Sequence, residues 1–528
     1  MATTTGTDGQ CGPAGWRRTA LAGSAGIGAA LVVVLTLGLP TGRTFGVEDN
    51  GDGYRLYCGI GLIPRTVDRL AAWKAGVVTN FTVGTPSCGA STPSSAGLVL
   101  RAAGLGGDGS LELDSVGWWY AALVGLVVAA AAWAASASGP WRAAVLVVPV
   151  APLALPLLTR FFVSTYAEPA GLLGTLALAC GVAALMVTGP EQRGARTTAL
   201  ILVALGGGVA ATAKVAYLPV LVVAVGVCAV TAVGRSRPRR VGPVIAGVTA
   251  LAVIVPIGAA AGFQDSVYEG ANVHDIVFTL ALPEFGPDAT AELGLPPEAA
   301  AFAGNGYFNG PPHPTGGWWS RAIRDEPDVT RSAAYAALVR HPGVLLRAVG
   351  VGLQATMRAD LPYLASGPAD PARPSPPGGD PGWSGARQPD LRTVLDAGPH
   401  PPWYPTALVA FALVAAASSV AWRHRAPAVA RWCLAAGLGA VTALGLVALA
   451  VLGDGYFEVF KHVWLAAYVL VLTGLCLLGA VAAGVGHLGR ARGIVGRRPG
   501  VWAPAAHADL ADLPPAPPRG PARATARR

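Results

Sequence analysis

Residues 198–233, TALILVALGGGVAATAKVAYLPVLVVAVGVCAVTAV, decide the fold class. The stretch holds 36 residues and a single charge, Lys214. A membrane-spanning helix needs about 20 apolar residues, so this stretch is too long for one ordinary span. Gly206-Gly207-Gly208 and Lys214 interrupt it. We therefore predict two membrane helices that meet in a turn near Ala213 and Lys214.

The composition of the whole chain indicates a polytopic membrane protein. Of its 528 residues, 53% are hydrophobic and only 13% are charged, whereas about a quarter of the residues of a soluble domain are charged. This composition excludes an ordinary cytosolic enzyme, and it excludes nucleic-acid binding as the meaning of the net charge of +9. The 70 glycines and 44 prolines show no short period, so a collagen-like chain is excluded as well.

Apolar runs of membrane-spanning length recur along the chain, and they predict an all-α fold of about ten transmembrane helices. Residues 1–18 form a cytoplasmic N-terminus. Helices 1–7 occupy 19–262, with a first outer loop at 41–115. A large outer segment covers 263–403, helices 8–10 cover 404–486, and 487–528 is a basic, disordered tail. The runs begin near Thr19, Val116, Ala143, Gly171, Thr198, Val215, Val241, Thr406, Trp432 and Val463.

The distribution of arginine predicts the orientation, because Lys and Arg in short loops favour the cytoplasmic side. Arg17 and Arg18 precede the first helix, and eight arginines lie between Arg490 and Arg528. The short turns on the opposite side hold only Arg160, Lys214 and Lys461. We predict a multi-pass plasma-membrane protein with both termini in the cytoplasm and two long extracytoplasmic segments.

Two further features of the outer segments carry predictions. Cys58 and Cys88 are the only cysteines of the first outer loop, so a disulfide between them is a candidate in an oxidising compartment. Residues 341–357 are predicted to form an amphipathic helix on the membrane surface. Residues 366–387 are rich in Pro, Gly and Asp and are predicted to be irregular.

The first acidic feature at a span boundary is Glu168, in Tyr166-Ala167-Glu168-Pro169 at the outer start of the fourth helix. Charges at the edge of a span are costly and need a reason. An acid and a proline are also favoured in the first turn of a helix for structural reasons alone. Glu168 is therefore either a functional carboxylate or a helix-start residue.

The second feature is Glu48-Asp49-Asn50-Gly51-Asp52, shortly after the first helix. Three carboxylates within five residues can bind a divalent cation such as Mg or Mn, or supply a general base. The spacing lacks the distal glutamate of an EF-hand. A polar Asx-rich turn is the structural alternative.

The third feature is Gly453-Asp454-Gly455-Tyr456-Phe457-Glu458-Val459-Phe460-Lys461-His462, at the outer start of the last helix. If this segment is helical, Asp454, Glu458 and Lys461 share one face. A solvated, ion-paired turn is the structural alternative. Lys214 is one of only three lysines in the chain. Its structural alternative is a side chain that reaches the lipid headgroups.

Taken together, these features gather carboxylates and cations at one face of the membrane. Such a set suits a reaction on a phosphate-bearing lipid, because a carboxylate can deprotonate an acceptor hydroxyl while cations stabilise a phosphate leaving group. No P-loop or GxGxxG–helix element is predicted on the cytoplasmic side, so nucleotide-driven transport is not supported.

The sequence resembles bacterial GT-C-like integral membrane glycosyltransferases, in particular the hexose transferases of glycan biosynthesis. The resemblance runs in order along most of the chain. It rests on the acidic turn at 48–52, Tyr166–Pro169, Ala213–Pro219, Val277-Phe278, Leu293–Pro296, Ala303–Phe308, His341–Gly343, Leu361–Leu364 and Gly453–His462. One position departs from the family pattern, in which the lysine is often followed by Pro-Gln and not, as here, by Val215-Ala216.

The resemblance implies a GT-C fold, a polyprenyl-phosphate sugar as donor, a glycan or lipid as acceptor, and chemistry at the outer face. An aspartate of the first outer loop would be the base or bind metal, a position that Asp49 and Asp52 match. The candidate catalytic residues are Asp52, Asp49 and Glu168, and the candidate metal ligands are Glu48, Asp49 and Asp52. The candidate substrate-binding residues are Lys214, Tyr166, Asp454, Glu458, Lys461 and His462.

Two other functions compete with transfer. A glycan or lipid carrier predicts charged residues deep within the spans, where this sequence has almost none. A non-catalytic scaffold for cell-envelope assembly is compatible with the two large outer segments.

Overall fold

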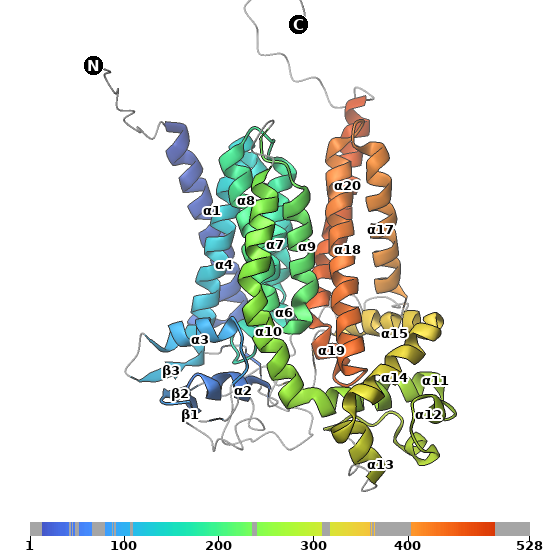
Figure 1. Ribbon diagram of the computed structural model, residues 1–528. Helices are drawn as coiled ribbons and strands as arrows, with labels where there is room; N and C mark the ends of the chain where they lie inside the picture. Colours follow the sequence, from blue (N-terminus) through green and yellow to red (C-terminus); the bar gives the residue numbers. More distant parts are fainter. Residues whose placement is uncertain are drawn as a thin grey trace, which may run out of the picture.

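The long apolar segments form a bundle of helices in a computed structural model, with smaller elements gathered at one end (Figure 1). The structure describes residues 13–41, 44, 46–47, 52–65, 80–86, 88, 91–105, 109–234, 240–308, 317–358, 361, 364 and 403–491. Glu48, Asp49, residues 366–387 and the chain after 491 lie outside the described residues. We call the end of the bundle that carries the smaller elements the loop end.

Eight helices of the described chain are long and apolar enough to cross a membrane, and up to ten spans result if each bent pair of helices counts as one. The predicted all-α polytopic fold is therefore confirmed. The eight spans contain α1 (Pro13–Leu37), α4 (Leu113–Ala135), α7 (Glu168–Val187), α8 (Arg193–Ala213), α10 (Val241–Asp275), α17 (Tyr404–Trp422), α18 (Pro427–Asp454) and α20 (Trp464–Ala491).

The turn predicted at Ala213 and Lys214 is confirmed, because α8 ends at Ala213 and Lys214 is extended. After a 3-10 turn, η7 (Val215–Tyr217), the chain enters α9 (Leu218–Val230). With 13 residues, α9 is shorter than the roughly 20 residues of an ordinary span.

The predicted third span is not one helix. It consists of the short pieces η4 (Pro140–Leu146), α5 (Val147–Val150), η5 (Ala151–Ala154), α6 (Pro156–Thr159) and η6 (Arg160–Phe162). The two halves meet at 83°. Pro149, Pro152 and Pro156 remove backbone donors and clash with the preceding turn, which explains the break.

The seventh helix extends well past the apolar run that ends at 262. α10 continues to Asp275, and a π-helical turn, η9 (Ile276–Ala281), leads into α11 (Leu282–Phe285). The apolar run predicts where the chain leaves the membrane, but a helix can continue with polar side chains wherever tertiary contacts support it.

The rest of the second outer segment is also mainly helical where the structure describes it, and its buried apolar residues, such as Phe278 and Trp319, form a separate core. A helix is present where 341–357 was predicted, since α15 spans Pro342–Ala355; its place on the membrane surface stays a prediction. It meets α14 at 101°. The elements are α12 (Ala289–Glu292), η10 (Pro297–Phe302), α13 (Gly317–Ser320), η11 (Arg321–Asp325), α14 (Pro327–Arg340), α15 and η12 (Thr356–Arg358).

The first outer segment contains two short helices, α2 (Asp52–Gly59) and α3 (Ala96–Gly104), and a small antiparallel sheet that the sequence analysis did not predict. The sheet has the order β1 (Leu62–Pro64), β2 (Asn80–Val83), β3 (Ser110–Glu112). In its register Leu62 faces Val83 and Phe81 faces Leu111.

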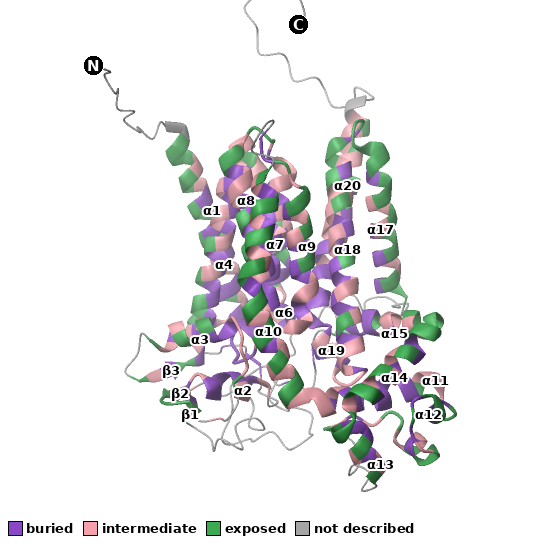
Figure 2. Cartoon of the chain, viewed as in Figure 1, coloured by how far each residue is buried: buried purple, intermediate pink, exposed green. Residues whose placement is uncertain are grey.

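Glycines allow the spans to approach closely. A Cβ on Gly174 of α7 would lie 2.5 Å from the carbonyl oxygen of Gly206 in α8, and one on Gly26 of α1 would lie 2.5 Å from that of Gly125 in α4. Such close backbone contact is typical of helix pairs in membranes. Buried residues follow the faces where helices meet, and exposed ones face outward (Figure 2).

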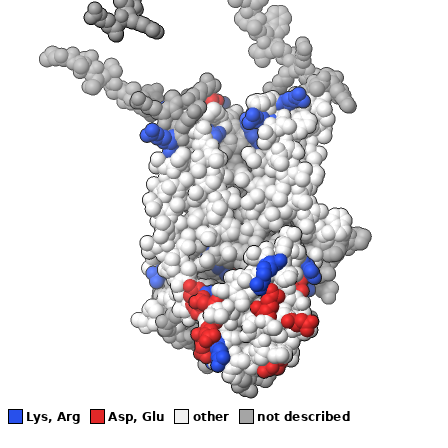
Figure 3. Space-filling view, turned by 45° about the vertical axis from the view of Figure 1, so that its right-hand side comes forward, with Lys and Arg blue, Asp and Glu red and all other residues white. Residues whose placement is uncertain are grey.

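The charged side chains lie at the two ends of the bundle. Figure 3 shows a broad zone of uncharged side chains between Lys and Arg at one end and mixed acidic and basic groups at the loop end. α1 begins and α20 ends at the end opposite the loop end (Figure 1). The arrangement is that of a multi-pass membrane protein.

Candidate functional site

A cavity of about 700 Å³ opens at the loop end of the bundle. Segments far apart in sequence build its wall: α2, the starts of α7 and η7, the second half of α10, and residues 454–462. Seven of the predicted site residues line it, namely Asp52, Tyr166, Glu168, Lys214, Asp454, Glu458 and His462. Lys461 lies directly behind them. Glu48 and Asp49 lie outside the described residues.

Lys214 and Glu168 form the first ion pair of the cavity. The extended backbone at Lys214 follows the end of α8, and its Nζ lies 3.1 Å from Oε1 of Glu168, in the first turn of α7. The Glu168 side chain is 2% exposed, whereas Lys214 keeps 24% of its surface exposed. Burial, the largest single cause, lowers the pKa of Lys214, but the carboxylates of Glu168, Asp52 and Asp454 together outweigh it, and the pKa is raised. Lys214 is therefore a cation that remains accessible from the cavity.

Lys461 forms the second ion pair. Its Nζ lies 2.5 Å from Oδ2 of Asp52 and 3.6 Å from Oε2 of Glu458, and its side chain is fully buried. The Tyr166 ring centroid lies 5.0 Å from the same nitrogen. Burial, the largest single cause, lowers the pKa of Lys461, but Asp52, Tyr166, Glu458 and Glu168 together outweigh it, and the pKa lies well above its usual value.

Asp52 is held as a carboxylate by this arrangement. Burial alone would raise its pKa, but the charges of Lys461 and Lys214 outweigh burial and hold the pKa far below its usual range. Tyr268 of α10 donates a hydrogen bond of 3.3 Å to Oδ1, so both carboxylate oxygens have partners. The described residues contain no group of three His, Cys, Asp or Glu side chains that could hold a metal ion. A divalent cation at Glu48, Asp49 and Asp52 therefore stays a prediction.

The prediction that Asp454, Glu458 and Lys461 share one helical face is wrong. α18 ends at Asp454, Gly455 has a φ of 60° and Glu458 a φ of 43°, and a separate turn, α19 (Val459–His462), follows. The break has a steric reason, because a Cβ on Gly455 would lie 2.4 Å from the carbonyl oxygen of Asp275. Asp454 consequently faces His462, with 3.3 Å between Oδ2 and Nδ1.

Sequence reasoning assigned no site role to the polar face of α10. Tyr268, Asn272 and Asp275 line the cavity, and their spacing of four and three residues puts them on one helical face. That spacing in the sequence could have found them, had the helix not been expected to end at 262.

The same part of α10 positions residues 304–308. Oδ1 of Asp275 accepts the backbone N–H of Tyr307 at 2.7 Å. His274 Nδ1 accepts the indole N–H of Trp319 at 3.2 Å, and its Nε2 lies 3.1 Å from the carbonyl oxygen of Asn305. An indole N–H can only donate, so Nδ1 carries no proton and Nε2–H donates to Asn305. These bonds bring Phe308 to the cavity wall.

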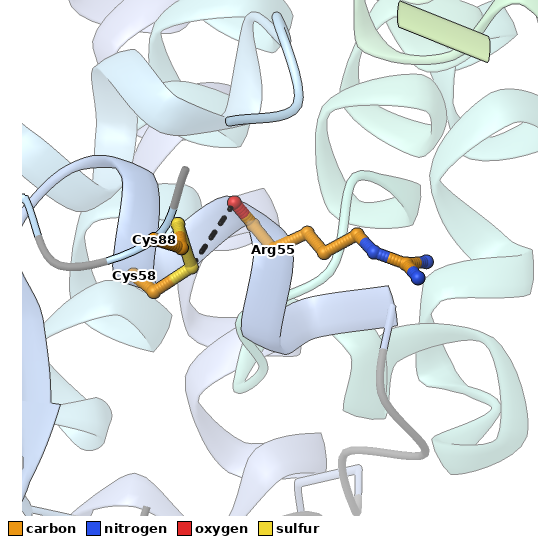
Figure 4. The surroundings of a disulfide bond; sticks show 3 residues. All are labelled: Arg55, Cys58 and Cys88. Carbon is orange, nitrogen blue, oxygen red and sulfur yellow. Dashed lines mark hydrogen bonds between the residues drawn. A yellow bond between two sulfur atoms is a disulfide. The ribbon is translucent and has the colours of Figure 1, made fainter. Parts of the chain in front are cut away.

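A disulfide between Cys58 and Cys88 fixes α2 on the side away from the cavity. In Figure 4 the disulfide lies against one side of α2, and the Arg55 side chain points in a different direction. Arg55 lines the cavity and stacks 4.4 Å over the ring of Tyr268. The disulfide thus helps to hold Asp52, at the start of the same helix, against Lys461.

Comparison with known proteins identifies the family. Residues 17–356 match the family described as the YfdI N-terminal transmembrane domain, which is more than half of the chain. The chain therefore belongs to this family. No curated protein and no solved structure matches it.

Proposed function

We propose that this member of the YfdI N-terminal transmembrane domain family is a membrane glycosyltransferase. In this proposal it moves a hexose from a polyprenyl-phosphate donor to a glycan or lipid acceptor of the cell envelope. The association of the family with membrane glycosyltransferase-like proteins supports the reaction class. The observation that carries the proposal is the cavity with Lys214 at its wall and Lys461 directly behind it, each lysine held by a carboxylate that lines the cavity.

The lysines suit the phosphate of a lipid-linked donor. An ammonium group has three N–H donors, and Lys214 uses one of them to bind Glu168. About a quarter of the Lys214 side chain remains exposed. A phosphate can occupy the remaining positions through charge-assisted hydrogen bonds. Because Lys461 is charged and adjacent, the leaving phosphate would meet two cations as the bond to the sugar breaks.

The position of the cavity suits a donor with a long polyprenyl chain. It opens at the end of the apolar bundle, where the spans pass into the loop end. A lipid tail could remain in the hydrocarbon while its phosphate and sugar enter the cavity. The arginine distribution favours a loop end outside the cytoplasm, and the reaction would then take place at the outer face of the plasma membrane.

Asp52 would act mainly by holding Lys461 in place. The sequence left Asp52 and Asp49 open as base or metal ligand. Both carboxylate oxygens of Asp52 already bind partners, Lys461 and Tyr268, which favours an electrostatic role for Asp52. Asp49, with Glu48, remains the candidate for a bound Mg or Mn ion.

A carrier that moves its substrate across the bilayer is less well supported. The Arg, Lys, Asp, Glu and His side chains that are buried in the described chain are Arg160, Glu168, His274, Asp275 and Lys461. All of them belong to segments at the loop end, and Figure 3 shows no charged path between the two ends on the visible face. A transport path needs polar groups along its length.

The test is transfer by the purified protein. Radiolabelled polyprenyl-phosphate hexoses are incubated with the protein and an envelope extract as acceptor, with divalent cation and with a chelator. We expect labelled product from the wild type and from the control variant Asp288→Asn, a change at the exposed N-cap residue of α12. We expect none from Asp52→Asn at an equal protein level. Undiminished transfer by Asp52→Asn would refute the assignment of the site.

A further inference from the structure

The cavity contains one titratable side chain to which the ion pairs described so far give no role, the imidazole of His462. It ends α19 and lines the cavity, with 12% of its side chain exposed. Its Nδ1 is fully buried and has no hydrogen-bond partner among the described residues, although Oδ2 of Asp454 lies only 3.3 Å away. The exposed part of the ring is therefore not Nδ1.

Asp454 is itself oriented by a neighbour. With its amide turned so that the nitrogen faces acceptors, Asn272 of α10 donates to Oδ1 of Asp454 at 2.8 Å and to the carbonyl oxygen of Tyr268 at 3.3 Å. One oxygen of Asp454 is thus bound by Asn272, and the other faces His462. An imidazole with one nitrogen against an anchored carboxylate and the rest of the ring toward a cavity is the arrangement of a general base and its orienting acid.

We propose that His462 is the general base of the transfer, and that Asp454 is the residue that positions it. The proposal rests on the proposed function, because it names the group that activates the acceptor of that reaction. Among the other described carboxylates of the cavity, Asp52 already binds Lys461 through Oδ2 and Tyr268 through Oδ1, and Glu168 already binds Lys214.

The step balances without a further reactant. The acceptor hydroxyl loses its proton to Nε2 of His462 as its oxygen forms a bond to the anomeric carbon of the donor sugar. The bond between that carbon and the phosphate oxygen breaks, and the phosphate leaves with the electron pair. Lys214 and Lys461 stabilise its charge, while Asp454 stabilises the imidazolium through Nδ1–H. The contact of 3.3 Å has to shorten on substrate binding, as is common for catalytic hydrogen bonds.

The electrostatic environment keeps the imidazole of His462 uncharged. Burial is the largest cause, and the charges of Lys214 and Lys461 act in the same direction, so the pKa of His462 lies well below its usual value. The imidazole is then neutral at neutral pH and can accept a proton. The charged groups around it are Asp454 from α18, Lys214 from the start of η7, Lys461 from α19, Glu458 from the preceding turn and Asp52 from α2.

The first test compares His462→Gln with His424→Gln, a matched change at an exposed histidine near the start of α18. A general base contributes roughly 10²–10⁴-fold to the rate. We expect kcat of His462→Gln to fall at least about 100-fold, with the KM for the donor little changed and with His424→Gln at the wild-type rate. His462→Ala should regain activity when imidazole is added, which a merely structural role would not produce.

The second test is the pH profile. The wild-type rate should rise with pH and level off once His462 is neutral, at a pH below the usual histidine range. Asp454→Asn removes an anion that favours the imidazolium, so its rate should be lower and its half-maximal point should move to lower pH.

The possible outcomes distinguish an error in the assignment of the general base from an error in the proposed function. Transfer by the wild type together with equally fast transfer by His462→Gln, or no rescue of His462→Ala by imidazole, would overturn the base alone. Absence of transfer by the wild type from every polyprenyl-phosphate hexose would overturn the proposed function, and the base with it.

Discussion

The ion pair of Lys214 and Glu168 allows a prediction in which the loss of stability depends on which partner is removed. Lys214→Met leaves the Glu168 carboxylate, 2% exposed, without its cation. Breaking a buried pair in this way costs about 3–5 kcal/mol, and we expect about 3 kcal/mol because Lys214 is itself 24% exposed. Glu168→Gln leaves a lysine that can still reach water in the cavity, so it should cost only about 1 kcal/mol.

The double variant distinguishes this reasoning from simple loss of packing. Lys214→Met with Glu168→Gln leaves no buried charge, so it should cost about 1–2 kcal/mol, less than Lys214→Met alone. The coupling between the two sites would then be about 2–3 kcal/mol. The assay is reversible unfolding in mixed micelles of increasing SDS content, followed by tryptophan fluorescence.

Arg340 and Glu292 provide the matched control. Their pair, at 2.6 Å, is 59% and 32% exposed, and exposed pairs contribute only about 0–1 kcal/mol. The cycle of Arg340→Met and Glu292→Gln should therefore show little coupling. If Glu168→Gln destabilises the protein more than Lys214→Met, or if the two changes are additive, the account of a buried carboxylate that needs its lysine is refuted.

Three other predictions follow from single features. Replacing Cys58 and Cys88 by serine should lower the local stability of the first outer segment by about 3–4 kcal/mol, because the disulfide closes a loop of 30 residues. Limited proteolysis of this segment should then be faster than in the oxidised wild type and as fast as in the reduced wild type. Gly306→Ala should raise the KM for the acceptor without lowering kcat much, because the new Cβ would lie 2.3 Å from the Phe457 ring at the cavity wall; an unchanged KM would contradict this. Lys461→Met should weaken donor binding at least about tenfold, because it removes a positive charge directly behind the cavity wall where the phosphate would lie. Equilibrium binding measures this, and unchanged affinity would count against a phosphate role.

The sequence was sufficient for the membrane class and for most span positions, because hydropathy over about 20 residues reports the thickness of the bilayer directly. The prediction of helix ends failed where a helix and an apolar run do not begin and end at the same residues. α10 continues to Asp275 although the apolar run ends at 262, and the proline-rich run from Pro140 to Phe162 is apolar but is not one helix.

For the site, the sequence identified charges at the span boundaries but not their pairing. Asp52 and Lys461 are 409 residues apart, and no local pattern predicts that they meet. The helical spacing of Asp454 and Glu458 suggested a shared face, but the positive φ angles at Gly455 and Glu458 turn the chain. Those angles depend on packing against Asp275 and Thr279, which only the tertiary structure reveals.

The most direct test of the central claim is the binding of polyprenyl phosphate to the purified protein, compared with binding of the polyprenol that lacks the phosphate. The account assigns the phosphate to Lys214 and Lys461. It therefore predicts at least tenfold tighter binding of the phosphorylated lipid by the wild type, and a much smaller difference in Lys461→Met. Equal affinity of the wild type for the two lipids would contradict it.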